Sequence, residues 1–375
     1  MTGDDDVLIT GMAWSTALGS DLDQVWRALL AGTTGMIPVP SQHRLRNDHA
    51  AILSDLPMDL GPERRQHELG ARALRAAVAD AGLDLTDPGL QLVAGTSYGS
   101  HLDVPPERLD RWGIGLAAES GMARRPLLVN TACSAASDAI LLGAALIAEG
   151  ELDRCVVGGA DVLTPAKRLG HSALGTMSPH ALRAFDADHD GTILGEGAAF
   201  LVLERAGSAR ARSARVRGRV AGAGSANDAA GPTAPDPDGD TIVQAVTAAL
   251  STAGRGIDEV VVVNAHGSGT PVNDEAESRG LARTFPGETG PIVFATKGNF
   301  GHTLGATGAL EAIAVLLALR DRRVPPIPGL RTVSPEFPLP VPTAATPLPD
   351  TGEVGLSITL GFGGFTTCLA LEVPA

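Results

Sequence analysis

The chain has 375 residues, 44% of them hydrophobic and 19% charged, which is typical of a soluble protein with two domains or one large double domain. Acidic residues outnumber basic ones by 43 to 29, giving a formal net charge of −14. Proteins that bind polyanions are usually basic, so this charge argues against nucleic acid and anionic membranes as partners.

The cysteines and the N-terminus indicate a reducing compartment. The three cysteines, Cys133, Cys155 and Cys368, are odd in number and far apart, which argues against a disulfide framework. The opening residues MTGDDD lack the basic region of a signal peptide, and no apolar run reaches the length of a membrane span. We therefore expect a cytoplasmic protein.

Short apolar runs alternate with helix-like segments along the chain. The strands predicted before residue 207 cover 7–13, 90–97, 154–161 and 198–204. The helices predicted there cover 63–82 and 133–149. Beyond residue 207, strands are predicted over 215–224, 259–267, 291–296, 356–364 and 366–373, and helices over 239–254 and 304–320. The proline-rich segments 231–240 and 324–350 are predicted to be surface loops.

This alternation predicts an α/β fold with sheets buried between helices. Similar elements follow in a similar order on both sides of residue 207. We therefore expect a pseudo-duplication, with halves 1–207 and 208–375.

Cys133 lies in TACSAASDAI, just before a segment that is apolar nearly all round. A thiol at a helix N-terminus lies near the positive end of the helix dipole, which favours the thiolate and lowers the pKa. Considered alone, however, a buried and inert cysteine is the commoner case.

Two histidines and a lysine favour a reactive Cys133 over an inert one. His266 lies in NAHGSGTPVND after an apolar strand, and Lys297 and His302 lie in TKGNFGHTLGATG between a strand and a helix. A cysteine with two histidines and a lysine suggests thiol acylation with proton transfer or charge stabilisation nearby. The close paired spacing of structural zinc motifs is absent from these segments, so a metal site is not expected.

These motifs resemble those of the β-ketoacyl-acyl carrier protein synthases, the condensing enzymes of fatty acid and polyketide assembly. The matching segments are TACSAAS, NAHGSGTP, TKGNFGHTLGATG and GFGG. The segment FDADHDGTILGEGA also looks like the family block FDxxRDGFxxGEGA, with His189 where Arg is usual. The resemblance spans essentially the whole chain, in the order of the family.

The resemblance implies a thiolase fold, with two pseudo-duplicated halves in an αβαβα five-layer arrangement, usually in a homodimer. It implies no metal or redox cofactor, because the substrates are carried on the phosphopantetheine of an acyl carrier protein. Cys133 would be the acyl-accepting nucleophile. His266 and His302 would bind the malonyl thioester carbonyl and promote decarboxylation. Lys297 would support the second histidine, and Glu311 would interact with this lysine.

Further roles follow from the same resemblance. The oxyanion hole would use the backbone N–H groups of Cys133 and Leu360. Gly361 and Phe362, the next two residues in the GFGG motif, would support the site. Leu360 would also replace the phenylalanine that usually gates the acyl pocket. Ser268 and Thr270 would contact the pantetheine arm. The remaining substrate-binding candidates are Phe365 and Thr366, which stand where the family usually has Thr-Asn.

Two features point towards a divergent, polyketide-type member. The sequence GNFGH is closer to the polyketide-type GNIGH than to the fatty-acid-type SMTGH. The segment between 95–100 and Cys133 is also shorter than usual, which affects the expected acyl pocket and dimer interface.

A carrier protein is typically acidic, so this acidic chain would need a local basic patch to bind it. Arg64, Arg65, Arg72 and Arg75 recur on one predicted helix, and the first two resemble the carrier-docking position of the family. Six arginines within 205–219 form a second candidate patch. The alternative for both patches is that the arginines form surface ion pairs with acidic neighbours.

The expected function is therefore a decarboxylative Claisen condensation between a Cys133-bound acyl group and malonyl-acyl carrier protein. One alternative is a non-condensing acyltransferase that uses the same cysteine. Another is a subunit of a heterodimeric ketosynthase that needs a partner for activity. The expected partners are an acyl carrier protein and either a second copy of the chain or a ketosynthase-like subunit.

Overall fold

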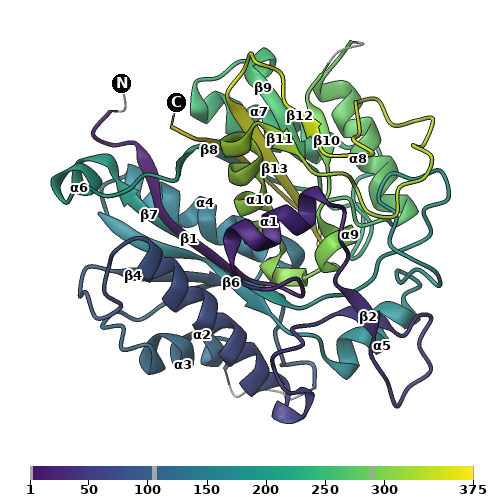
Figure 1. Ribbon diagram of the computed structural model, residues 1–375, viewed down its shortest axis with the longest axis horizontal. Coiled ribbons are helices and arrows are strands. Elements are labelled where there is room, and N and C mark those ends of the chain that lie inside the picture. Colours follow the sequence, from purple (N-terminus) through teal and green to yellow (C-terminus); the bar gives the residue numbers. More distant parts are fainter. Residues whose placement is uncertain (1–2, 104–107, 288–289, 375) are drawn as a thin grey trace.

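The computed structural model describes residues 3–103, 108–287 and 290–374 (Figure 1). Its main feature is a ten-stranded mixed sheet made of two halves with five strands each. Outward from the centre, one half runs β1 (Val7–Ser15), β7 (Gly197–Arg205), β6 (Arg154–Asp161), β4 (Gln91–Gly95) and β5 (Leu127–Val129). The other half runs β8 (Gly218–Asn227), β14 (Phe365–Glu372), β13 (Val354–Gly361), β9 (Val260–Asn264) and β10 (Ile292–Phe294).

The two halves share one pairing pattern. In each half the first three strands pair antiparallel and the last two join in parallel. Within the sheet, the two halves are joined where β1 and β8 pair over three residues, Val7–Ile9. This repetition confirms the expected pseudo-duplication of structure, whereas the division into two domains at residue 207 remains a prediction.

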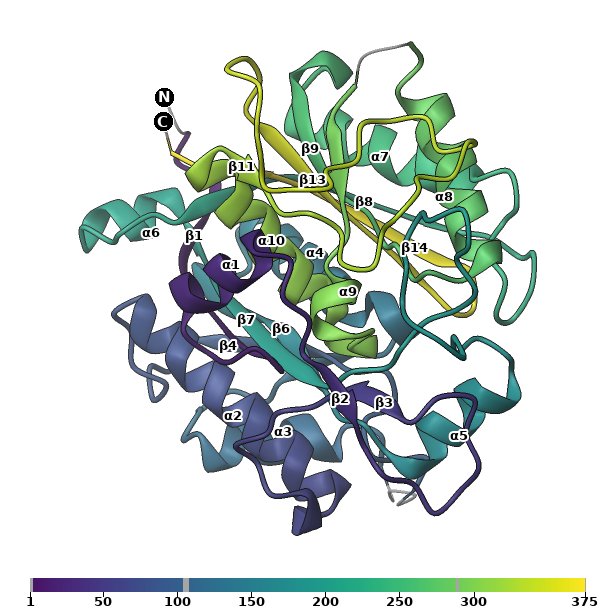
Figure 2. The same ribbon diagram turned by 45° about the vertical axis from the view of Figure 1, so that its right-hand side comes forward.

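Helices separate and cover the two halves in five layers (Figure 2). The central layer consists of α4 (Ala135–Ala148) and α10 (Thr307–Asp321), which contact each other and strands of both halves. One outer layer is α2 (Pro62–Asp80) with α3 (Arg111–Glu119), and the other is α7 (Asp240–Ala253) with α8 (Pro271–Thr284). Every residue of α10 from Thr307 to Leu319 is buried, as an almost uniformly apolar helix requires. The expected αβαβα arrangement is confirmed.

Shorter elements connect this framework. They are α1 (Leu22–Leu30), β2 (Met36–Pro38), β3 (His49–Ala51), α5 (Pro165–Ala173), α6 (Ala206–Ala211), α9 (Lys297–Phe300), β11 (Arg323–Val324), β12 (Thr346–Pro347) and the 3₁₀ turns Met58–Leu60, Ala132–Ser134, Ile257–Glu259 and Leu304–Ala306. Among the described helices, none is both long and apolar enough to cross a membrane.

The N-terminal ends of α4 and α10 pack unusually close together. A Cβ atom on Gly308 would collide with the hydroxyl of Ser137, which itself bonds the hydroxyl of Thr359 at 2.9 Å. Each helix begins with a 3₁₀ turn, so both start two or three residues later than the sequence predicts. The turn before α4 contains Cys133, and the turn before α10 follows His302 by two residues.

The arginines expected to bind a carrier protein differ sharply in exposure. Arg64 is 59% exposed and pairs with Glu68 one turn later, whereas Arg65 is only 3% exposed. The Arg65 guanidinium bonds both carboxylate oxygens of Glu196 at 2.9 Å and donates to backbone carbonyls of Leu53 and Leu56. The prediction that Arg65 docks a carrier is therefore wrong, because its guanidinium is buried and paired with Glu196 inside the protein.

The second basic segment consists mostly of ion pairs. Five of its six arginines lie within 4 Å of an acidic side chain, namely Arg205, Arg210, Arg212, Arg217 and Arg219. Arg72 is similarly paired with Asp55 at 2.5 Å. The ion-pair alternative holds for these residues.

We predict that Arg65→Ala lowers the free energy of unfolding by about 3–5 kcal/mol, because it leaves the Glu196 carboxylate buried without its partner. Arg64→Ala, the adjacent control, should change it by less than about 0.5 kcal/mol. Urea unfolding followed by circular dichroism measures both values. Equal losses in the two variants would contradict the assignment of Arg65 as a buried structural residue.

Candidate active site

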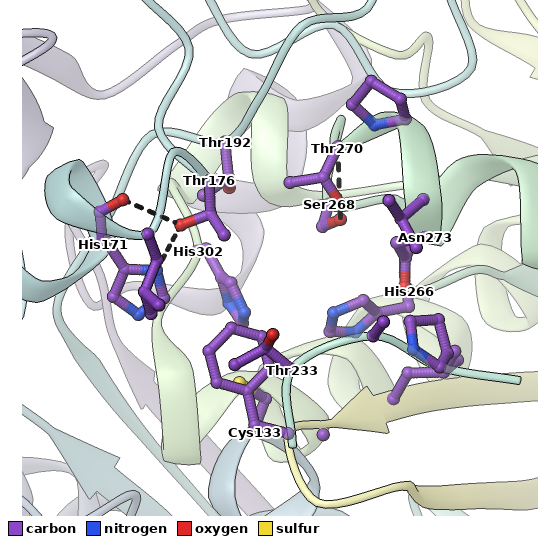
Figure 3. Close-up of a pocket in the computed structure, with 18 of the residues that line it drawn as sticks. Cys133, His171, Thr176, Thr192, Thr233, His266, Ser268, Thr270, Asn273 and His302 are labelled. Carbon is purple, nitrogen blue, oxygen red and sulfur yellow. Dashed lines mark hydrogen bonds between the residues drawn. The ribbon is translucent and has the colours of Figure 1, made fainter. Parts of the chain in front are cut away.

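A cavity of about 250 Å³ opens at the N-terminal ends of the two central helices (Figure 3). Cys133, His266 and His302 all line it, although they are far apart in sequence. The imidazoles of His266 and His302 lie edge to face, with ring centroids 5.2 Å apart. The structure thus brings together the nucleophile and both histidines expected from the sequence.

Cys133 occupies the 3₁₀ turn before α4 and is only 5% exposed. The preceding residue, Ala132, has a φ of 52°, a left-handed conformation that is strained for a residue other than glycine. This sharp turn places the thiol at the base of the cavity rather than inside the helix.

The backbone N–H of Phe362 is directed towards the Cys133 sulfur and acts to lower the pKa of the thiol. Leu360, the oxyanion donor expected from the sequence, lies two residues before Phe362. Leu360 is part of β13, opposite Thr366 of β14, and contributes its side chain to the cavity wall. Phe362 lies in the turn between these strands, where Gly363 and Gly364 have φ values of 89° and 83° that favour glycine. Phe362 also lines the cavity, so an aromatic side chain is present two residues after Leu360, which was expected to replace the usual phenylalanine.

Burial dominates the acidity of Cys133 and raises its pKa to about 12. The Lys297 ammonium and the Phe362 N–H act in the opposite direction but do not offset burial. The lowered pKa expected from the helix N-terminus is thus not found. In the unliganded site the thiol is protonated at neutral pH.

The backbone fixes the tautomer of His302. Its Nδ1 atom accepts the N–H of Leu304 at 3.3 Å and lies 3.3 Å from the hydroxyl of Thr307. A nitrogen that accepts an N–H carries no proton, so the proton of the neutral ring is on Nε2. His302 therefore offers an N–H donor.

His266 lies on the loop between β9 and α8, and this loop is held by two buried carboxylates. Glu277 accepts the backbone N–H groups of His266 and Gly267 at 2.6 and 2.7 Å. Asp274 accepts the N–H of Gly269 at 3.1 Å. The strand β9 ends at Asn264, three residues earlier than predicted, and this leaves room for the loop.

Lys297 contacts the first histidine rather than the second. Its ammonium donates to the backbone carbonyl of His266 and to Glu311, whose carboxylate lies 2.6 Å away. Both side chains are fully buried, and burial raises the pKa of Glu311 to about 7. The expected contact between Lys297 and Glu311 is present, but the expected support of His302 is not a direct contact.

Both catalytic-site histidines are held neutral. Burial, followed by the Lys297 charge, lowers the pKa of His266 and that of His302 well below the usual range. A neutral imidazole keeps one N–H donor and one acceptor, so each ring can bind a carbonyl oxygen without carrying a charge.

The expected substrate-binding residues fall into two groups. Ser268 and Thr270 line the cavity, and their hydroxyls are 2.8 Å apart. Thr366 instead bonds Thr241 on α7 at 3.0 Å, and neither it nor Phe365 lines this cavity. The structure thus separates Phe365 and Thr366 from the site in which they were expected.

Family models and known proteins match along most of the chain. Residues 4–111 and 116–209 match the model described as "Beta-ketoacyl synthase, N-terminal domain", and residues 217–331 match "Beta-ketoacyl synthase, C-terminal domain". The chain belongs to the beta-ketoacyl synthase family. It is accordingly an acyltransferase of this type.

Two curated relatives illustrate the similarity. The chain is 30% identical to 3-oxoacyl-[acyl-carrier-protein] synthase 2 of Mycobacterium tuberculosis (strain ATCC 25618 / H37Rv), over 97% of the chain and 96% of that protein. It is 31% identical to the protein of the same name from Synechocystis sp., over 98% of the chain and 97% of that protein.

Solved structures agree in fold. "The ishigamide ketosynthase/chain length factor" has a TM-score of 0.89 at 30% identity, covering 100% of both chains. A beta-ketoacyl synthase from Burkholderia phymatum STM815 has a TM-score of 0.89 at 29% identity, covering 99% of this chain and 100% of that one. These matches confirm the thiolase-type fold.

The structure adds residues that sequence reasoning missed. His171, Thr176 and Thr192 line the cavity, as do Thr233 and Ala234 of a segment predicted to be only a surface loop. The helix α5 that carries His171 was not predicted. Asp274 and Glu277 could have been found, because they stand 8 and 11 residues after His266 with a helical spacing of three. The shortened segment before Cys133 includes residues 104–107, which lie outside the described residues.

We predict that Cys133 reacts with iodoacetamide about a hundredfold faster at pH 9 than at pH 7, because below a pKa of about 12 the thiolate fraction rises tenfold per pH unit. Labelling followed by peptide mass spectrometry measures the rate. Cys155 and Cys368, which are fully buried in the core, serve as internal controls and should remain unlabelled. A rate that is already constant between pH 6 and 8 would instead reveal a low-pKa thiolate.

Proposed function

We propose that the protein catalyses a decarboxylative Claisen condensation between an acyl group on Cys133 and malonyl-acyl carrier protein. The observation that carries this proposal is the placement of two neutral imidazoles beside one thiol in a single cavity. Simple acyl transfer needs one thiol and one oxyanion site. A second carbonyl-binding group is useful when a second thioester must be activated.

In the first half-reaction the Cys133 sulfur attacks the thioester of an acyl carrier. The N–H groups of Phe362 and Cys133 stabilise the oxyanion that forms. The carbon–sulfur bond to the carrier breaks, and the thiol proton of Cys133 ends on the departing pantetheine sulfur. The products are an acyl-Cys133 thioester and free carrier thiol.

In the second half-reaction a malonyl thioester enters, and its carbonyl oxygen accepts the Nε2–H of His302 and an N–H of His266. Loss of carbon dioxide leaves an enolate, whose negative oxygen these donors stabilise. The enolate carbon attacks the acyl carbonyl, and the bond to the Cys133 sulfur breaks. One proton from solvent restores the thiol.

The charges around the histidines favour this role. A neutral donor binds the developing oxyanion without attracting the malonyl carboxylate that must be lost. Burial and then the positive charge of Lys297 keep both rings neutral, and the contact of Lys297 with the His266 carbonyl holds the loop. Ser268 and Thr270 lie across the cavity from Cys133, where they can contact a pantetheine arm (Figure 3).

We propose an acyl carrier protein and a second ketosynthase subunit, identical or similar, as partners. One structure with the same fold, 22% identical, is titled a type II PKS acyl-carrier protein in complex with its ketosynthase bound to the hexaketide. The ishigamide structure pairs a ketosynthase with a chain length factor. On this chain, β5 is an edge strand with Leu127 41% exposed, which suits pairing with another subunit.

We also propose a polyketide-type pathway and a cytoplasmic location. The GNFGH segment and the match to the ishigamide structure favour a polyketide-type enzyme, while curated relatives of similar identity are named 3-oxoacyl-[acyl-carrier-protein] synthases. The cytoplasm suits a chain whose three cysteines are all buried and unpaired.

We predict that Cys133→Ala abolishes the acyl adduct formed with an acyl carrier, and that His302→Ala preserves the adduct but lowers carbon dioxide release from malonyl carrier by at least about a hundredfold. Intact mass spectrometry and ¹⁴C-labelled malonyl measure the two steps. Adduct formation by the unmodified protein without decarboxylation would favour a non-condensing acyltransferase. No adduct would favour a non-catalytic subunit.

We predict that Arg64→Glu raises the KM for acyl carrier protein about fivefold or more, while the KM for an acyl-pantetheine without the protein stays unchanged. Arg72→Glu is the matched control, because Arg72 is also exposed and paired with an acidic side chain but lies about two turns further along α2. An unchanged KM for the carrier in Arg64→Glu would exclude this docking position.

A further inference from the structure

One wall of the cavity that contains Cys133 is lined by polar side chains. His171 of α5, Thr176 and Thr192 form this polar wall, on the side opposite Ser268, Thr270 and Asn273 (Figure 3). The three residues are directly linked, because the backbone N–H of Thr192 bonds the carbonyl of Thr176 at 2.8 Å and the Thr176 hydroxyl bonds His171. The mechanism proposed above uses none of them.

The hydrogen bonds around Thr176 determine the tautomer of His171. The Thr176 hydroxyl donates its only hydrogen to the backbone carbonyl of His171 at 3.1 Å, because a carbonyl can only accept. The same hydroxyl lies 2.9 Å from Nδ1 of His171 and, with its own hydrogen engaged, accepts a hydrogen bond from the Nδ1–H. His171 consequently carries its proton on Nδ1, and Nε2 is an acceptor that has no hydrogen-bond partner within the described part of the chain.

His171 is also closely tied to the reacting centre. Its ring stacks on that of Phe362, with centroids 5.7 Å apart and planes inclined by 23°. Phe362 is the residue whose N–H reaches the Cys133 sulfur. Cys133, His171 and Phe362 line the same cavity, so a substrate group held in it can contact this stacked pair.

Thr192 provides a second unused polar group. Its side chain is only 2% exposed, and its hydroxyl has no hydrogen-bond partner among the described residues. A buried hydroxyl without a partner costs free energy, so a polar group that reaches it from the adjoining cavity gains a hydrogen bond. In the family block FDxxRDGFxxGEGA the corresponding position is phenylalanine, so this chain has a smaller and polar side chain there.

We propose that the polar wall binds a hydroxyl group on the acyl chain carried by Cys133. A hydroxyl can donate to Nε2 of His171 and accept from Thr192, whereas a ketone can only accept and an alkyl chain can do neither. This inference rests on the proposed function, since it names the substrate class of the same site.

The polar wall carries no charge of its own at neutral pH. Burial and the nearby Lys167 ammonium lower the pKa of His171 to about 4, so the ring is neutral near pH 7. The Lys167 charge is itself paired with the buried carboxylate of Asp161. The wall thus selects by hydrogen bonding rather than by charge.

The test compares hexanoyl, 3-hydroxyhexanoyl and 5-hydroxyhexanoyl pantetheine thioesters as acyl donors to the full-length protein. The second-order rate constant of acyl-Cys133 formation is followed by intact mass. We expect at least one hydroxylated donor to react at least about tenfold faster than hexanoyl. His171→Phe, which keeps a ring against Phe362, and Thr192→Val, which keeps the shape, should each reduce this ratio to within about twofold.

Leu169→Ala is the matched control, because Leu169 lies on α5 but is exposed outside the cavity, and its ratio should equal that of the unmodified protein. Preference for neither hydroxylated donor, or a preference that survives in both variants, overturns the inference while leaving the proposed function intact. If no donor acylates Cys133, the proposed function fails and this inference fails with it.

Discussion

The contact between the N-terminal ends of α4 and α10 determines the rest of the site. The two helices come close enough there that Gly308 leaves no space for a side chain beside Ser137. The turn before one helix carries Cys133, and the turn before the other follows His302. A bond from the backbone N–H of Gly305 to Asp161 at 2.9 Å ties this junction to β6. Two similar halves thus place their helix starts face to face, and the reactive groups meet between them.

Burial at this junction determines the charge state of each group. It keeps the Cys133 thiol protonated although the Lys297 ammonium lies close by. Burial and the Lys297 charge together keep both histidines neutral. The lysine remains tolerable because Glu311 and a backbone carbonyl surround it. The site therefore works with hydrogen-bond donors and fixed dipoles, which need little rearrangement when negative charge appears on a substrate oxygen.

Periodicity and motifs were enough to predict the framework and the reactive residues. The strand 154–161 was predicted with its exact limits, and the buried helices were found because apolar side chains cover them all round. The sequence could not show which of two neighbouring arginines is buried, since Arg65 differs from Arg64 only in its angle on α2. It also could not show that the donor to Cys133 is Phe362, because the turn after β13 decides where each N–H points. The polar wall was missed because its members come from α5 and two loops, and only the fold joins them.

Phe362 has two contacts that use different parts of the same residue. Its backbone N–H reaches the sulfur that forms the acyl bond, and its ring supports the imidazole of His171. The peptide plane and the ring share one Cα atom in a turn made rigid by strand pairing on both sides. In the proposed mechanism, a shift of the Phe362 backbone would therefore alter acyl-group selection and oxyanion binding together.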